Sequence, residues 1–163
     1  MKRIMLFGLP GSGKSTAALE LSDRLQLSLH HLDKYFFIEN WAKRDYDDFL
    51  RLLGEMVSQE SWIIDGNCMR SLEMRFERAD TAIYFCFPVL TCLWRVLKRR
   101  FQTRCPIDDR AEGCGEALHW NLIWYLICYK RKYREKIELL HEKYPDVKFI
   151  VVKNDKEVRK VIF

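Results

Sequence analysis

The sequence predicts an α/β fold in which helices cover both faces of a five-stranded parallel sheet. Apolar runs typical of strands alternate with helical patterns along the whole 163-residue chain. A glycine-rich loop directly follows the first apolar run, and an aspartate closes each of the next two. Ligands of such sheets bind beyond the carboxyl ends of the strands. We therefore expect the loop and the two aspartates to share one edge of the sheet.

The first half of the chain contains three of the expected strands. Residues 3–7 form the first, and the helix after the glycine-rich loop has apolar residues at helical spacing. Residues 28–32 form a short second strand. The apolar positions within residues 46–57 repeat every 3.6 residues and predict an amphipathic helix. Residues 62–64 form a buried third strand, which ends at the turn sequence of residues 65–67.

The second half of the chain contains the remaining strands and a polar segment. Residues 81–87 are almost continuously apolar, which is typical of a strand buried on both faces. Residues 102–115 are polar and contain a proline and two glycines, so we expect a small mobile lid there. The other expected elements are helices over residues 70–78, 90–101, 116–144 and 155–162 and a strand over residues 147–152.

Length and composition favour one domain over residues 1–163. Hydrophobic residues make up 48% of the chain and charged residues 31%, which is ordinary for a globular protein. Gly8 and Pro10 interrupt the apolar start of the chain, so we expect no targeting segment. The most apolar later stretch, residues 118–128, is about half as long as a membrane span. We predict a soluble, cytoplasmic protein.

The six cysteines and four histidines do not predict a zinc site. The cysteines are scattered without a C-x-x-C pair, as expected of reduced thiols. Cys105 and Cys114 flank a polar segment, but no second pair or nearby histidine completes four ligands. The net charge of +5 suits a protein that handles anions and does not distinguish nucleotides from nucleic acid.

Residues 8–16 match the pattern G-x-x-x-x-G-K-[ST] of a phosphate-binding loop. Its glycines permit backbone dihedrals that turn successive N–H groups inward, which creates an anion site at the start of the next helix. Lys14 adds a positive charge at the β- and γ-phosphates, and the Ser15 hydroxyl is placed to ligate Mg²⁺. We therefore predict ATP and Mg²⁺ as cofactors. The expected nucleotide-binding residues of the loop are Gly8, Gly11, Ser12, Gly13, Lys14, Ser15 and Thr16.

The two strand-end aspartates are candidates for different tasks. An aspartate that closes a buried strand can hold Mg²⁺ through its water shell, so we assign Asp65 to the metal; its alternative role is to cap a turn or a helix. Asp33 follows a shorter strand, where an acid often only caps the next element. In the expected acceptor pocket, however, Asp33 could take the proton of a hydroxyl group.

Four arginines are candidates for stabilising the phosphoryl group during its transfer. Phosphoryl transfer needs positive charge around the migrating group more than it needs covalent chemistry. Arg95 and Arg99 are four residues apart, so both can point at one anion from the same helical face. Arg104 and Arg110 lie in the predicted lid, whose closure would bring them onto the phosphates and exclude water. The alternative for all four is a solvated basic surface.

The order of these features resembles the adenylate-kinase-like branch of nucleoside and nucleotide kinases. That branch combines a phosphate loop, a strand-end Asp-Gly pair with an arginine after it, an Arg-x-x-x-Arg helix and an arginine-bearing lid. More specifically, the sequence resembles the bacterial proteins known as FlaR-related DNA topology modulation proteins. The resemblance covers essentially the whole chain, and the segments that match are residues 8–15, 31–33, 62–67, 92–100 and 111–114.

The kinase resemblance implies roles for the arginines. It implies that Arg95 stacks on the nucleotide base or contacts phosphate, that Arg99 and a lid arginine stabilise the transferring phosphoryl group, and that Arg70 binds the acceptor. Adenylate kinases place a phenylalanine, a proline and an arginine immediately after the Asp-Gly pair. Here residues 67–69 precede Arg70, so the spacing is one residue longer and the acceptor site is expected to differ.

Two functions are compatible with the sequence. The first is an ATP- and Mg²⁺-dependent phosphotransferase of the nucleotide- or nucleoside-kinase type, whose small-molecule acceptor offers either a phosphate or a hydroxyl oxygen. The second, suggested by the family label, is an ATP-binding protein that acts on DNA topology without such kinase activity. The sequence contains no recognisable DNA-binding module. Aromatic and basic residues within residues 120–136 could bind single-stranded nucleic acid, but we favour an aromatic core stripe with a solvated charged face.

Overall fold

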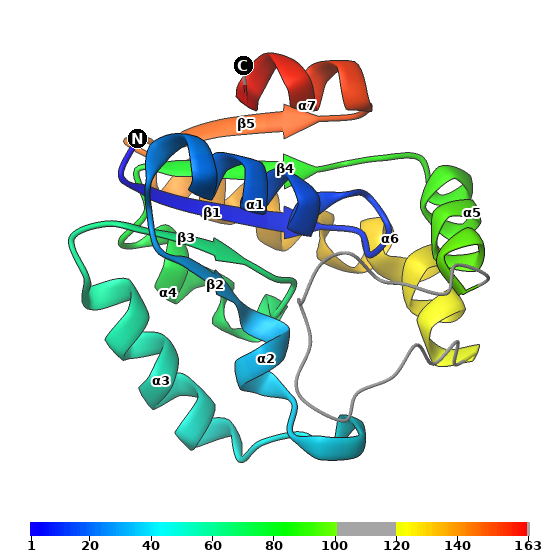
Figure 1. Cartoon of the computed structure of the whole chain (residues 1–163), viewed down its shortest axis with the longest axis horizontal. Helices are drawn as coiled ribbons and strands as arrows, with labels where there is room; N and C mark the ends of the chain where they lie inside the picture. Colours follow the sequence, from blue (N-terminus) through cyan, green and yellow to red (C-terminus); the bar gives the residue numbers. More distant parts are fainter. Residues whose placement is uncertain (101–119, 163) are drawn as a thin grey trace.

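The computed structural model describes residues 1–100 and 120–162 and has a five-stranded, all-parallel sheet between layers of helices (Figure 1). The strand order is β2-β3-β1-β4-β5. The strands are β1 (Arg3–Gly8), β2 (Leu29–His31), β3 (Trp62–Asp65), β4 (Thr81–Phe85) and β5 (Lys148–Val152). This arrangement confirms the α/β fold that the sequence predicts. The predicted lid, residues 102–115, lies outside the described residues.

β1 lies at the centre of the sheet, between β3 and β4. Its residues Ile4, Met5 and Leu6 are fully buried, as expected of a parallel strand that is covered on both faces. The register places Leu6 beside Asp65 of β3, and Asp65 beside His31 of β2. The segments that follow β1, β2 and β3 therefore emerge at the same edge of the sheet.

Helices cover both faces of this sheet. On one face, α1 (Lys14–Leu25) contacts α7 (Asp155–Ile162), and Arg24 of α1 donates to the carbonyl of Ile162. α4 (Leu72–Phe76) and α6 (Trp120–Lys143) lie on the opposite face (Figure 1). There the rings of Phe76 and His141 stack on Phe149 of β5.

Two of the remaining helices, α5 (Val89–Arg100) and α2 (Leu32–Phe36), lie at the carboxyl edge of the sheet (Figure 1). α5 lies beyond the strand ends, and α2 continues directly from β2 (Figure 1). A 3₁₀ turn (Glu39–Trp41) then leads to α3 (Tyr46–Ser58), whose Ncap Asp45 accepts from the backbone N–H groups of Asp47 and Asp48. The sequence did not predict α2 or the 3₁₀ turn, because both are too short for a periodic pattern.

Two sequence predictions need correction. The helix predicted over residues 70–78 is a 3₁₀ turn (Met69–Ser71) followed by the short α4, which ends at Phe76 and whose C-cap residue Glu77 donates its N–H to the carbonyl of Glu73. The aromatic stripe of α6 is core in part. Tyr129 is fully buried as predicted, but 69% of Trp124 is exposed, so Trp124 is not a core residue.

Candidate functional site

The glycine-rich loop joins β1 to α1 at the carboxyl edge. Gly8, Gly11 and Gly13 have φ angles of +132°, +76° and +90°, a region that favours glycine. A Cβ atom at Gly8 would lie 2.4 Å from the carbonyl oxygen of Phe85, and one at Gly11 would lie 2.6 Å from that of Cys92. Both positions therefore need glycine for space as well as for conformation.

The loop is organised around the carbonyl of Leu9. This oxygen accepts hydrogen bonds from the Ser12 hydroxyl at 2.7 Å and from the Lys14 ammonium group at 3.0 Å. α1 begins at Lys14, and its Ncap residue Gly13 contributes no side chain. The first backbone N–H groups of α1 and the buried charge of Lys14 thus meet at the loop, which is the composition of an anion site. The side chains of Ser15, half-buried, and Thr16, exposed, belong to the same first turn.

Asp65 lies at the end of β3 and pairs with a histidine that the sequence analysis did not select. Its Oδ2 is 3.0 Å from Nδ1 of His31, and both side chains are buried. The other carboxylate oxygen, Oδ1, is buried and has no hydrogen-bond partner among the described residues. A buried carboxylate oxygen without a donor and the Ser15 hydroxyl suit Mg²⁺, which takes few protein ligands and keeps several waters. The residues therefore fit the metal that the loop implies.

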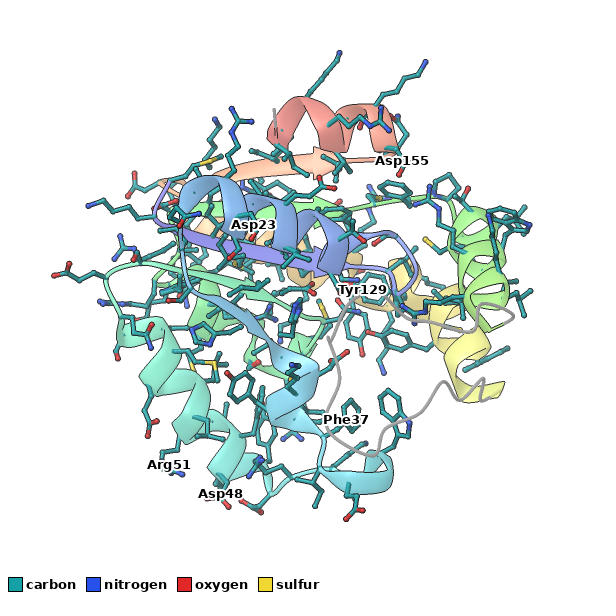
Figure 2. All side chains as sticks on the ribbon, viewed as in Figure 1. Asp23, Phe37, Asp48, Arg51, Tyr129 and Asp155 are labelled. Atoms are coloured by element: carbon teal, nitrogen blue, oxygen red, sulfur yellow. The ribbon has the colours of Figure 1, made fainter. Side chains whose placement is uncertain are left out.

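Asn67 connects the loop to α6. Its Oδ1 accepts from the backbone N–H of Gly8 at 3.2 Å and from the Tyr129 hydroxyl at 2.8 Å. Its Nδ2 donates to the Tyr125 hydroxyl at 2.5 Å. Figure 2 shows Tyr129 beside the carboxyl end of β1. Burial raises the pKa of both tyrosines above the ordinary value, so both hydroxyls stay protonated near neutral pH. Sequence reasoning treated Asn67 only as part of a turn and missed this role.

Arg75 of α4 holds the same turn in place through two hydrogen bonds. Its side chain is fully buried. Nη1 donates to the carbonyl of Gly66 and Nη2 to that of Cys68, each at 2.9 Å. Burial lowers the pKa of Arg75 to about 10, so the guanidinium remains charged near neutral pH. Arg75 therefore holds the two residues that flank Asn67. The sequence pattern had placed this arginine on a charged helix.

The two predicted acceptor residues lie on segments that border this turn. Asp33 is exposed and is the second residue of α2. A Cβ atom at Gly66 would lie 2.5 Å from Cβ of Leu32, so the start of α2 contacts the turn after β3 closely. Arg70 is exposed, and its guanidinium carbon lies 3.9 Å above the ring centre of Tyr46. This stacking leaves the N–H edge of the guanidinium available for an anion.

The structure brings Arg95 to the phosphate loop. Its Nη1 donates to the carbonyl of Ser12 at 3.4 Å, and its Nη2 pairs with Asp155 at 2.6 Å. Asp155 begins α7 at the same end of the sheet (Figure 2). Arg99 lies one turn further along α5 and is half-buried. The predicted lid arginines, Arg104 and Arg110, lie outside the described residues.

The strand order and the glycine-rich loop together define the class of fold. A parallel sheet of order β2-β3-β1-β4-β5, with a phosphate-binding loop after the central strand, is the P-loop kinase fold. Solved structures agree. A shikimate kinase from Acinetobacter baumannii in complex with shikimate has a TM-score of 0.65 at 15% identity, over 99% of this chain and 89% of that one.

Two further kinases of this fold are similar. A gluconokinase from Sinorhizobium meliloti 1021 has a TM-score of 0.56 at 15% identity, over 99% of this chain and 87% of that one. A deoxyadenosine kinase from M. mycoides with bound dCTP has a TM-score of 0.52 at 18% identity, over 98% and 95% of the two chains. No family model and no curated protein matches the sequence. None of the helices in the described part of the chain has the length and apolar character needed to span a bilayer.

Proposed function

We propose that the protein is an ATP- and Mg²⁺-dependent phosphotransferase of the nucleotide- or nucleoside-kinase type, which acts on a small-molecule acceptor. The observation that carries this proposal is the meeting of three features at one sheet edge: the Lys14 loop, the buried carboxylate of Asp65 and the guanidinium of Arg95. The similarity in fold to kinases of three different acceptors supports it.

The donor half of the site is assigned to the loop. Its backbone N–H groups and Lys14 bind the phosphates of ATP, with Gly8, Gly11, Ser12, Gly13 and Thr16 shaping the loop. Ser15 would ligate Mg²⁺ directly, and Asp65 would hold its water shell. Bound there, Mg²⁺ neutralises charge on the phosphate oxygens. The hydrogen bond from His31 to Oδ2 of Asp65 orients the carboxylate and leaves Oδ1 for the water shell of the metal.

The transferring group is assigned to the arginines. Arg95 reaches the loop from α5 and stacks on the nucleotide base or contacts phosphate. Arg99, with Arg104 or Arg110, stabilises the charge that spreads over the transferring oxygens. In this assignment Asp155 holds the Arg95 guanidinium while no nucleotide is bound. The ion pair is weak because Asp155 is mostly solvent-exposed, so a nucleotide phosphate can displace Asp155 from Arg95.

The acceptor half is assigned to Asp33 and Arg70. A hydroxyl acceptor needs a group that takes its proton, whereas a phosphate acceptor attacks through an oxygen that is already anionic. Asp33 fits the first chemistry. Shikimate, gluconate and deoxyadenosine, the compounds named for the similar kinases, all carry hydroxyl groups. We therefore favour a hydroxyl acceptor, and the Arg70 guanidinium favours one that also carries negative charge.

The test is acceptor-dependent formation of ADP. Purified protein is incubated with ATP, Mg²⁺ and a panel of shikimate, gluconate, deoxyadenosine and nucleoside monophosphates. We expect turnover with an acceptor that bears a hydroxyl, loss of that turnover in Lys14→Ala, and no loss in the control Lys98→Ala on the exposed side of α5. Asp33→Asn should lower turnover by about 10²- to 10⁴-fold. The absence of stimulation by any acceptor, together with tight and salt-dependent DNA binding, would contradict the proposal and favour a role in DNA topology.

A further inference from the structure

We propose that Tyr125 donates a hydrogen bond to the transferring phosphoryl group, and that Asn67 is the positioning residue that sets the direction of this hydrogen bond. The inference rests on the proposed phosphotransferase function and adds a residue to that site. Neither the glycine-rich loop nor the strand-end aspartates pointed to it. It follows from the hydrogen bonds that join Gly8, Asn67 and two tyrosines of α6.

The backbone of Gly8 fixes the orientation of the Asn67 amide. The Gly8 N–H can only donate, so the Asn67 atom 3.2 Å away must be the carbonyl oxygen, Oδ1. The amide nitrogen therefore faces Tyr125. The alternative orientation would place two donors against each other at Gly8, inside a part-buried turn where an unpaired donor is costly.

The orientation of Asn67 in turn fixes the polarity of the Tyr125 hydroxyl. Nδ2 of Asn67 has no lone pair to offer, so across the 2.5 Å contact the Tyr125 oxygen accepts. The phenol proton of Tyr125 must then point elsewhere. Tyr129 differs, because its hydroxyl donates to Oδ1 of Asn67 and also contacts the sulfur of Met69. Of the two tyrosines bonded to Asn67, Tyr125 is the one with a proton to give.

The contacts of Asn67 place the Tyr125 hydroxyl next to the loop at which the transfer is proposed. Asn67 is two residues beyond Asp65 and contacts the first residue of the phosphate loop. The side chain of Tyr125 is half-buried, so part of it is exposed. The negative charge of Asp33 contributes, after burial and Tyr133, to raising the pKa of Tyr125. Tyr125 therefore lies within electrostatic range of the acceptor-side carboxylate as well as next to the donor loop.

A neutral donor suits the chemistry of this position. In the transfer, the acceptor oxygen forms a bond to the γ-phosphorus, the bond to the β–γ bridging oxygen breaks, and ADP leaves with the electron pair. The proton of the acceptor hydroxyl goes to Asp33, and Tyr125 keeps its own. A preorganised donor aimed at the equatorial phosphoryl oxygens stabilises the charge that they carry in the transition state.

The experiment compares Tyr125→Phe with the control Tyr133→Phe. Tyr133 packs against Tyr125 and Tyr129, and its hydroxyl makes no hydrogen bond to the described residues. We expect Tyr125→Phe to lower kcat by about 10- to 100-fold, which is typical of one hydrogen bond to a charged group, with KM for ATP within about twofold of wild type. Tyr133→Phe should leave both constants unchanged. Equal kcat values for Tyr125→Phe and wild type would overturn the inference.

A second probe separates this inference from the proposed function. Mg²⁺-ADP with aluminium fluoride mimics the transferring group and needs no acceptor turnover. Tyr125→Phe should weaken retention of the fluoride complex by the same factor and leave the affinity for Mg²⁺-ADP alone unchanged. If no acceptor supports turnover but this difference is found, the proposed function fails and the inference stands. If acceptors are phosphorylated but Tyr125→Phe and wild type retain the fluoride complex equally, the inference fails and the function stands.

The positioning role of Asn67 has its own readout. Asn67→Ala should lower kcat as far as Tyr125→Phe does, and the double variant should lose no more than either single one. Hydrogen exchange of the Gly8 amide, followed by NMR, should accelerate in Asn67→Ala and remain slow in Tyr125→Phe. Additive losses of kcat, or unchanged exchange at Gly8 in Asn67→Ala, would refute the positioning role.

Discussion

Replacing Arg75 with methionine tests whether the hydrogen bonds of a buried cation outweigh the cost of burying it. The guanidinium donates to the carbonyls of Gly66 and Cys68 and so holds the turn that contains Asn67. Methionine keeps much of the side-chain volume but removes both donors. The sign of the stability change is therefore decided by the balance between hydrogen bonding and desolvation.

The structure allows both quantities to be estimated. Burial lowers the pKa of Arg75 from the ordinary 12.5 to about 10, and at about 1.4 kcal/mol per pKa unit this corresponds to a cost of about 3–4 kcal/mol for the charged form. Two hydrogen bonds from a charged donor contribute about 1.5–3 kcal/mol each, or about 3–6 kcal/mol together. The net loss in Arg75→Met should be about 1 kcal/mol, which lowers Tm by about 2–4 °C for a chain of this size.

Urea unfolding followed by circular dichroism measures this change, with Arg78→Met as the control. Arg78 is on the same segment but exposed, so its substitution should change the free energy of unfolding by less than about 0.5 kcal/mol. Affinity for Mg²⁺-ADP should also fall in Arg75→Met, because the turn orients Asn67 against Gly8. An Arg75→Met protein that is as stable as wild type, or more so, would show that desolvation outweighs the hydrogen bonds and would refute the reasoning.

Three further predictions follow from the geometry. Gly8→Ala should abolish binding of Mg²⁺-ATP in a calorimetric titration, since the new Cβ would lie 2.4 Å from the Phe85 carbonyl oxygen. Asp65→Asn should raise the Mg²⁺ concentration needed for half-maximal turnover by about 10- to 100-fold, as measured by titration of the metal at saturating ATP. Burial of Asp80 opposes ionisation, but N–H groups of Lys2 and Arg3 and the Thr81 hydroxyl lower its pKa below 3.8 overall. Its contribution to stability is therefore complete above pH 3.8 and is lost as the pH falls through the lowered pKa, so acid should destabilise wild type more than Asp80→Asn.

The phosphate loop and the order of strands and helices were predictable because their signals are local. Gly8 to Thr16 form one continuous motif, and each strand is a separate apolar run. Asp65 was found for the same reason, as an acid at the end of such a run. The five-stranded parallel sheet confirms the predicted fold class.

The supporting residues were not predictable because their partners are distant in the sequence. Asn67 bonds to Gly8, 59 residues away, and to Tyr125, 58 residues away. Arg75 lies in a charged stretch, where a buried arginine and an exposed one have the same local pattern. Its burial depends on how α4 packs under the turn after β3, and no short-range periodicity records that contact.

The segment that carries Asp33, the proposed acceptor residue, is attached to the sheet by its shortest strand. β2 has three residues and lies at the edge of the sheet, and the segment that follows it, through α2 and α3, includes Asp33 and Tyr46. The central strand β1 and the phosphate loop take no residue from that segment. Under the proposed function, sequence change after Leu32 in this segment would alter which compound is recognised and leave the phosphate loop unchanged. Residues 33–58 are then the natural region in which to engineer, or to look for, divergence of substrate.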